Sequence, residues 1–217
     1  MNKAAIFDLD GTLIDSVGDI ALCCNTALEI SGLPQHDPEE YRNFIGWGVD
    51  VLISKAIGPQ GDKAFHQKVL ADYSTIYGDI CSGGCKMFPG IPEMLRSLRA
   101  YGILTAVVSN KPQAQTEAVY LSTLSGLVDA WYGQHPGWPT KPDPCGVRYV
   151  LEQLGPDVRP IAYVGDSEVD VATGRAAGIP TVGVSWGMKS RGFLLDSGAG
   201  EVADTVEELE KILLQKA

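Results

Sequence analysis

The sequence predicts an α/β fold, in which a doubly wound parallel sheet is interrupted by an inserted α-helical domain. In the second half of the chain, short apolar runs alternate with stretches of helical periodicity, which is typical of a parallel sheet flanked by helices. The first apolar run, residues 4–9, is far from the others, because residues 16–80 are nearly all helical in pattern. We therefore expect a core of residues 1–15 and 82–217 and a second domain of residues 16–81.

In the first half, periodicity and helix-start signals place the elements. The apolar run at 4–9 ends in acids and is expected to form a buried strand. Asp37 is followed by Pro38, which favours a helix with Asp37 as its cap and the proline in its first turn. The helices expected here cover residues 15–31, a segment starting at 38, and residues 49–57 and 63–77.

The second half continues the alternation of strands and helices. Residues 103–108 are an unbroken apolar run, typical of a parallel strand buried on both faces. Thr205 and Glu208 have the spacing of a capping box and predict the start of the last helix. The other predicted strands are 128–132, 161–164 and 181–184, and the other predicted helices are 92–100, 113–124, 146–154 and 169–177.

Composition limits the class of protein and its partners. The 217 residues are 45% hydrophobic and 20% charged, which suits a globular protein with a sizeable core. No apolar run approaches the roughly 20 residues that cross a bilayer, and the N-terminus lacks the pattern of a secretory signal. We expect a cytoplasmic monomer or homodimer without a membrane partner. The net charge of −10 argues against nucleic acid, and an anionic substrate would need local cations.

The cysteines give no sign of a disulfide framework. There are five of them, an odd number, and we interpret them as reduced thiols. Cys81 and Cys85 lie close together in the sequence CSGGC, but a zinc site needs two more ligands. None of the three histidines lies near a cysteine in sequence, so zinc is not expected.

Polar residues follow several of the predicted strands. In doubly wound sheets, ligands bind at the carboxyl ends of the strands, so these residues are expected to meet. Lys141 precedes a proline-marked helix start between two of the strands. The strand-end residues are Asp8, Asp10 and Thr12, then Ser109, Asn110 and Lys111, and finally Asp166, Ser167 and Asp170.

Four of these residues are acids in two pairs. Alternation along an extended segment would place Asp8 and Asp10 on the same side, where they repel unless a proton or cation separates them. Asp166 ends a strand, and Asp170 lies in the first turn of the next helix. Without a functional site, the first pair could belong to a solvated turn, and helix capping could account for one acid of the second pair. A hard divalent cation explains all four together, and Mg²⁺ prefers such oxygen ligands.

Lys141, Ser109 and Asn110 supply groups that the acids lack. A lysine near Asp8 would offset carboxylate charge and hold a phosphoryl oxygen. Ser109 offers a hydroxyl, and Asn110 offers a backbone donor. Taken singly, Lys141 is better explained as a surface lysine before a helix start, and Ser109 and Asn110 also form a strand-to-helix turn.

Four segments together resemble the motifs of the haloacid dehalogenase-like hydrolase superfamily. These are DLDGT at 8–12, SNK at 109–111, KPDP at 141–144 and GDSEVD at 165–170. Each motif is weak alone, but the ordered set is specific and covers nearly the whole chain. The resemblance implies a Rossmann-like core with a helical cap inserted just after the first motif.

The resemblance also implies roles for these residues. Asp8 would be the nucleophile, forming an aspartyl-phosphate, and Asp10 would be the general acid and base. Mg²⁺ would be held by Asp8, Asp166 and the backbone carbonyl of Asp10. Asp170 would contact the metal through a water, or contact the residues that bind the metal. The groups implied to bind the phosphoryl group are Thr12, Ser109, Asn110 and Lys141, of which Lys141 also counts as catalytic.

Within this superfamily the chain is most similar to phosphoglycolate phosphatases, through residues 44–56, 109–112 and 165–187. The segment 133–139 departs from the family by lacking a Gly-Gly-Asp sequence, and CSGGC is not a family feature. The expected partner is a small phosphorylated metabolite such as 2-phosphoglycolate. Pyrophosphatase and sugar phosphomutase activities share the motifs, whereas a dehalogenase would give Asp10 no leaving oxygen to protonate. A non-catalytic phosphate-binding regulator is the alternative from another class.

The turn Gly46-Trp47-Gly48 is expected to lie over the site as a cap loop. As plain structure, it would join two helices around a partly buried tryptophan. If the substrate carries a carboxylate, a cation near this loop is expected to meet it. The candidates for substrate recognition by the cap are Arg42, Trp47 and Lys55.

Overall fold

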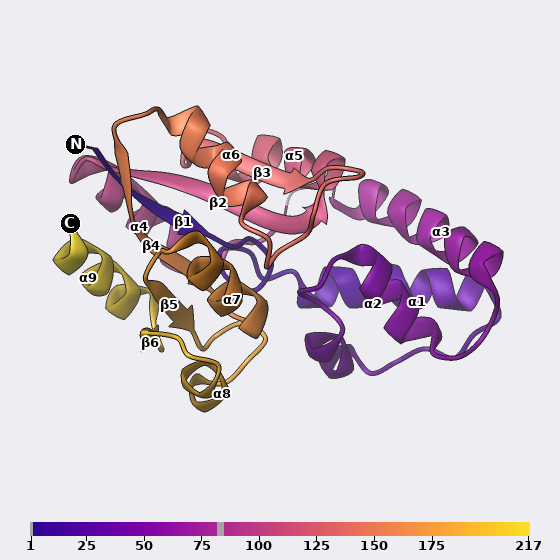
Figure 1. Ribbon diagram of the computed structural model, residues 1–217. Coiled ribbons are helices and arrows are strands. Elements are labelled where there is room, and N and C mark those ends of the chain that lie inside the picture. The colour runs from indigo at the N-terminus through magenta and orange to yellow at the C-terminus, as the bar shows by residue number, and fades with distance from the viewer. Residues whose placement is uncertain (1, 82–84) are drawn as a thin grey trace.

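The computed structural model describes residues 2–81 and 85–217. Across this part of the chain, six parallel strands form one sheet in the order β3-β2-β1-β4-β5-β6 (Figure 1). The chain builds one half of the sheet outward from β1 and then crosses to β4, so the order reverses next to β1, where ligands of such sheets bind. The strands are β1 (Asn2–Phe7), β2 (Ile103–Pro112), β3 (Ala130–Gln134), β4 (Val158–Gly165), β5 (Thr181–Val184) and β6 (Glu201–Ala203). The predicted fold class is confirmed.

Helices cover both faces of the sheet. Side chains of β1 alternate between them, so Phe7 packs in the core on one face and Ile6 in the core on the other. Both residues are fully buried, as expected for parallel strands between helices. The first face is covered by α4 (Ile91–Ala100), α5 (Gln113–Val119) and α9 (Val206–Lys216), and the second by α6 (Cys145–Leu154) and α7 (Glu168–Ala177).

A separate group of helices follows β1 and lies beyond the carboxyl ends of the strands (Figure 1). Its members are α1 (Val17–Ile30), the 3₁₀ helix η1 (Pro38–Asn43), α2 (Val49–Ile57) and α3 (Lys63–Cys81). Tyr41, Ile53 and Tyr77 are fully buried within this part of the core. We refer to these helices as the helical block. The division into domains at residues 16 and 81 stays a prediction, and the second boundary adjoins residues outside the described part.

Helix caps follow the sequence signals with small differences. The Asp37 carboxylate accepts a hydrogen bond from the amide of Glu39, and the Glu40 side chain closes a capping box, but the helix that they start is 3₁₀ rather than α. The Thr205 hydroxyl accepts a hydrogen bond from the Glu208 amide, as expected of a helix cap. The helix predicted at 113–124 ends as a π-helix, η2 (Tyr120–Leu124).

Two short elements escaped the sequence analysis, namely β6 and the helix α8 (Arg191–Asp196). They are three and six residues long, too short to show a hydrophobic period. They lie at one edge of the sheet, where β6 pairs with β5 and α8 packs against both strands.

The described cysteines fit the expectation of thiols. Cys24 and Cys145 are in no disulfide, and burial raises the pKa of Cys24 to about 11. Residues 82–84 of the CSGGC segment, and the side chain of Cys81, lie outside the described residues. Within the described chain, no helix is both long enough and apolar enough to span a membrane.

Candidate active site

The segment after β1 forms a tight turn that brings acids to the end of the sheet. The Asp8 amide donates to the carbonyl of Val164 at 2.8 Å, so Asp8 continues the pairing of β1 with β4. The chain then turns at Gly11, whose φ of +85° favours glycine. A Cβ at Gly11 would lie 2.2 Å from Oδ2 of Asp166, so the close approach to Asp166 also requires glycine.

Three carboxylates meet at the carboxyl ends of β1 and β4. Asp8, Asp166 and Asp170 each offer an oxygen, and these atoms lie within 4.8 Å of one another. All three residues are buried. The adjacency of β1 and β4 explains why acids separated by more than 150 residues meet, since parallel neighbours end at the same edge of a sheet.

Lys141 is the cation of this cluster. Its Nζ lies 2.7 Å from Oδ1 of Asp8 and 2.7 Å from Oδ1 of Asp170, and its side chain is 4% exposed. Burial on its own would lower the pKa of the ammonium. The attraction of Asp170 and Asp8 outweighs burial and raises the Lys141 pKa well above its ordinary value. Lys141 is therefore charged at neutral pH.

One ammonium does not neutralise three carboxylates. Burial, followed by repulsion from Asp170, outweighs the attraction of Lys141 and raises the pKa of Asp8 to about 7. The same two causes raise the pKa of Asp166 well above its ordinary value. A divalent cation among these oxygens would favour the ionised carboxylates, and an all-oxygen donor set suits a hard cation such as Mg²⁺. The residues present therefore fit a metal site.

Further contacts hold the two acids that follow β4. Asp166 accepts hydrogen bonds from the Met188 amide at 2.6 Å and from the Thr12 hydroxyl at 3.3 Å. Thr12, expected to bind phosphate, is fully buried behind Asp166 and does not line the pocket. Asp170 completes a capping box with Ser167 at the start of α7 and also binds Lys141. Asp170 therefore both caps α7 and belongs to the acidic cluster.

Ser109 and Asn110, at the carboxyl end of β2, differ in what they can do. Ser109 lines the pocket, and its hydroxyl accepts a hydrogen bond from the Lys111 amide at 3.1 Å. The side chain of Asn110 binds the backbone of Lys141, accepting from its amide at 2.7 Å and donating to its carbonyl at 3.3 Å. Asn110 also donates to the carbonyl of Gly46 at 3.0 Å. Its side chain therefore positions Lys141 and joins the core to the cap loop.

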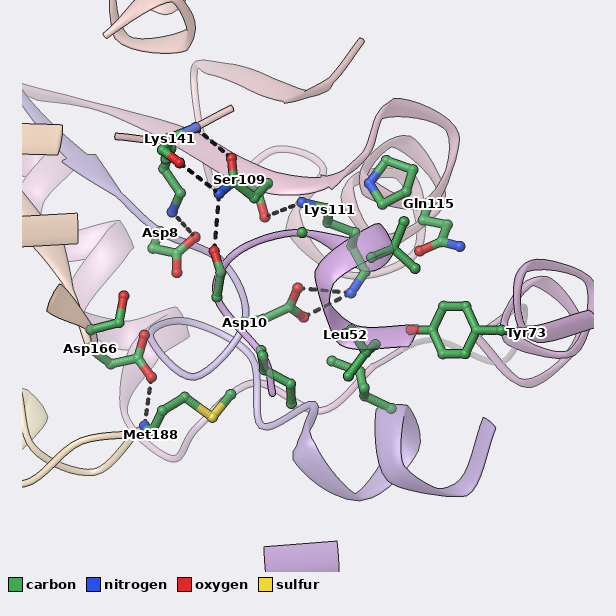
Figure 2. A pocket seen from close by; sticks show the side chains of 18 residues that line it. Asp8, Asp10, Leu52, Tyr73, Ser109, Lys111, Gln115, Lys141, Asp166 and Met188 are labelled. Atoms are coloured by element: carbon green, nitrogen blue, oxygen red, sulfur yellow. Dashed lines mark hydrogen bonds and ion pairs between the residues drawn. The ribbon is translucent and has the colours of Figure 1, made fainter. Parts of the chain in front are cut away.

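Asp10 does not join the three-carboxylate cluster. Its carboxylate faces Lys111, whose Nζ lies 2.9 and 2.8 Å from the two oxygens. Figure 2 shows this pair next to the cluster around Asp8, with the Asp10 side chain turned toward Lys111. Lys111 received no role from the sequence, although it is the third residue of the SNK motif. Only its position directly after Ser109 and Asn110 indicated that it would lie in the site.

A pocket of about 540 Å³, including its open mouth, lies between the sheet and the helical block, and its lining includes Asp8, Asp10, Lys111, Lys141 and Asp166. The core contributes the polar floor, which includes Asp8, Lys141 and Asp166 (Figure 2). The helical block contributes mainly apolar and backbone groups, namely Ile20, Ile45, Gly46, Gly48, Val49, Leu52 and Tyr73. The expected loop therefore does lie over the site, through its two glycines.

The three cap residues singled out from the sequence lie outside this pocket lining. Arg42 binds the Glu39 carboxylate at 2.7 Å and donates to the carbonyl of Gly187 at 2.8 Å. Lys55 donates to the carbonyl of Asn43 at 2.6 Å and borders a different surface depression. Trp47 is 40% exposed and donates to the Glu168 carboxylate at 3.4 Å. Their contacts are with protein groups, and substrate recognition by them stays a prediction without support from this geometry.

Gly187 packs tightly behind the acidic cluster. A Cβ there would lie 2.3 Å from both Oδ2 of Asp166 and the carbonyl oxygen of Gly11. We expect Gly187→Ala to lower the free energy of unfolding by about 1–3 kcal/mol, because the backbone must shift to make room. The matched control is Gly192→Ala in α8, where no atom lies within 4 Å of the added carbon. Urea unfolding tests both, and equal stability of the two variants would contradict the tight packing.

Comparisons with known proteins find similarity over nearly the whole chain. A family model described as haloacid dehalogenase-like hydrolase matches residues 5–184. A phosphoglycolate phosphatase of Haemophilus influenzae strain Rd is 32% identical over 215 residues, covering 95% of this chain and 96% of the relative. One of Aquifex aeolicus is also 32% identical, covering 98% and 99%. A crystal structure of a proposed phosphoglycolate phosphatase from Lactobacillus delbrueckii subsp. bulgaricus superposes with a TM-score of 0.90 at 31% identity, covering 98% and 99%.

Proposed function

This chain belongs to the haloacid dehalogenase-like hydrolase family, and on that premise we propose that it is a magnesium-dependent phosphatase acting on a small phosphomonoester such as 2-phosphoglycolate. The observation that carries the proposal is the setting of Asp8. Its buried carboxylate lies 2.7 Å from the Lys141 ammonium, beside Asp166 and Asp170, at the floor of a pocket between sheet and cap. The full-length similarity to phosphoglycolate phosphatases supports the choice of substrate.

The proposed reaction has two steps. In the first, an oxygen of Asp8 attacks the phosphorus, the bond to the ester oxygen breaks, and Asp10 gives that oxygen a proton. In the second, Asp10 takes a proton from a water that attacks the phosphorus, and inorganic phosphate leaves Asp8. Asp10 is thus returned to its protonated state after each turnover.

The remaining groups stabilise charge. Lys141 and Ser109 both line the pocket, and in this proposal they hold the phosphoryl oxygens, which carry the charge that develops during transfer. Mg²⁺ bound by Asp8, Asp166 and the Asp10 carbonyl would neutralise part of that charge. Asp170 holds the Lys141 ammonium in place, with its Oδ1 lying 2.7 Å from Nζ of Lys141.

The test is phosphate release from a panel of 2-phosphoglycolate, an aryl phosphate, pyrophosphate and a sugar bisphosphate. We expect hydrolysis of 2-phosphoglycolate that stops on chelation, returns with Mg²⁺ and needs no zinc. Mg²⁺ should also raise the melting temperature, since it offsets repulsion among the buried carboxylates. Full activity after exhaustive chelation would contradict the metal site. No release from any ester would support a non-catalytic phosphate-binding protein, and preference for pyrophosphate or transfer between sugars would favour the related activities.

A further inference from the structure

Lys111 is a buried cation that lines the pocket, and it has no role in the proposed reaction. It lies at the carboxyl end of β2, and its side chain is 3% exposed. The Lys111 amide binds the hydroxyl of Ser109, and its Nζ lies 4.5 Å from the ring centroid of Tyr77 in α3. The ammonium is thus held where the sheet meets the helical block. Burying the charged ammonium of a lysine costs free energy unless a group of opposite charge pairs with it.

The partner in this structure is Asp10, the proposed general acid and base. Nζ of Lys111 lies 2.9 and 2.8 Å from its two oxygens, and the Asp10 side chain is 12% exposed. Both oxygens of the proposed proton donor therefore bind a cation. A carboxylate held in this way has no oxygen directed at a leaving group near Asp8, so the pair must loosen or rearrange before Asp10 can transfer a proton.

The position of Lys111 along the pocket indicates what it meets. The phosphoryl group would lie against Asp8 and Lys141, and its ester oxygen must come within reach of Asp10. Figure 2 shows Lys111, Gln115 and Tyr73 on the far side of Asp10 from Asp8 and Asp166. The part of the substrate beyond the ester oxygen is therefore directed toward Lys111.

Charge then limits what that part can be. Among the described residues, Lys111 and Lys141 are the cations that line the pocket, together with the acids Asp8, Asp10 and Asp166. Lys141 is occupied by Asp8 and Asp170, each at 2.7 Å. A carboxylate at the leaving-group end would face repulsion from the acids unless it bound Lys111. A neutral group there would leave the Lys111–Asp10 pair intact.

We propose that Lys111 is the residue that recognises a carboxylate at the leaving-group end of the substrate, and that this carboxylate replaces Asp10 on the Lys111 ammonium. The exchange frees Asp10 to turn toward the ester oxygen. Binding of the correct substrate thus releases Asp10, which must then take a proton from solvent before it can act as the donor of the first step. The inference rests on the proposed phosphatase function and assigns to Lys111 the recognition expected from the sequence for Arg42 or Lys55.

The experiment compares kcat/KM for 2-phosphoglycolate with kcat/KM for 2-hydroxyethyl phosphate, an ester of similar size without the carboxylate. The variants are Lys111→Met, which removes the charge, and Lys111→Arg, which keeps it. Lys111→Gln is the second neutral variant if the methionine variant does not fold. The matched control is Lys68→Met on α3, an exposed lysine that lies 2.8 Å from Asp72.

We expect wild type and Lys68→Met to prefer 2-phosphoglycolate, and Lys111→Met to lower that preference by about tenfold to a hundredfold, the scale of one charge-assisted hydrogen bond. Lys111→Arg should retain most of it. Equal losses on both esters in Lys111→Met would overturn the inference, because a residue that only positions Asp10 affects every substrate alike. That result leaves the phosphatase function standing, whereas wild-type protein inactive on both esters would refute the function itself.

Discussion

Asp8→Asn should lower kcat by at least about a thousandfold, because the amide keeps the shape of the side chain but cannot attack phosphorus. The measurement is steady-state hydrolysis of 2-phosphoglycolate with saturating Mg²⁺. The amide can still accept a hydrogen bond from Lys141, which lies 2.7 Å from Asp8, so the local structure should survive. A kcat within tenfold of wild type would show that Asp8 is not the nucleophile.

The control for this variant is its stability without metal. Burial and Asp170 raise the pKa of Asp8 to about 7, which means that the ionised carboxylate is unfavourable in the folded, metal-free protein. We therefore expect metal-free Asp8→Asn to melt no lower than metal-free wild type. A lower melting temperature would mean that the loss of activity reflects unfolding.

Lys141→Met should have the second large effect, on both activity and stability. The side chain is 4% exposed and lies 2.7 Å from both Asp8 and Asp170. Its removal leaves buried carboxylates without their ammonium, and breaking a buried ion pair in this way costs about 3–5 kcal/mol. We expect kcat to fall by about a hundredfold to a thousandfold, since a donor to the transferring phosphoryl group is lost.

Urea unfolding with and without Mg²⁺ separates the two effects. In chelator, Lys141→Met should unfold at lower urea than wild type, and Mg²⁺ should recover part of the difference by offsetting the same carboxylates. Lys216→Met is a suitable control, because the side chains of its ion pair with Glu201 are 26% and 46% exposed, and such a solvent-accessible pair contributes little. Unchanged stability of Lys141→Met would contradict the buried charge cluster as described.

Much of the fold was predictable because its signals are local. Parallel strands between two layers of helices are apolar throughout, and glycines or capping residues mark where elements end. The helix α2 (Val49–Ile57) and the strand β5 (Thr181–Val184) have the predicted bounds for this reason. The meeting of Asp8 with Asp166 was predictable too, since the carboxyl ends of neighbouring parallel strands lie at one edge.

The unpredicted features depend on side-chain directions and on contacts between distant loops. Alternation placed Asp10 on the same side as Asp8, but the turn at Gly11 and the buried charge of Lys111 direct its carboxylate away. Arg42 donates to the carbonyl of Gly187, a backbone group that no sequence pattern marks. Local spacing identifies which residues gather at a sheet edge and leaves open which of them form pairs.

The same limit applies to the contacts around Asp166. Its oxygens accept from the Met188 amide and the Thr12 hydroxyl, so a residue expected to bind phosphate instead holds a proposed metal ligand. Both contacts arise from loops that approach only in the folded chain. Motif membership thus placed Thr12 next to the site, but the phosphate binding that it implied for Thr12 has no support from this contact.

Chemical trapping of the covalent intermediate tests the central claim, that Asp8 carries the phosphoryl group during turnover. Protein mixed with 2-phosphoglycolate and Mg²⁺ is quenched in acid within the first turnover and reduced with borohydride, which converts an aspartyl-phosphate but not a free carboxylate to homoserine. Peptide mass spectrometry should then find homoserine at position 8 in wild type, and none without substrate or in Asp8→Asn. Sustained hydrolysis with an unmodified Asp8, or homoserine at another aspartate, would contradict the account.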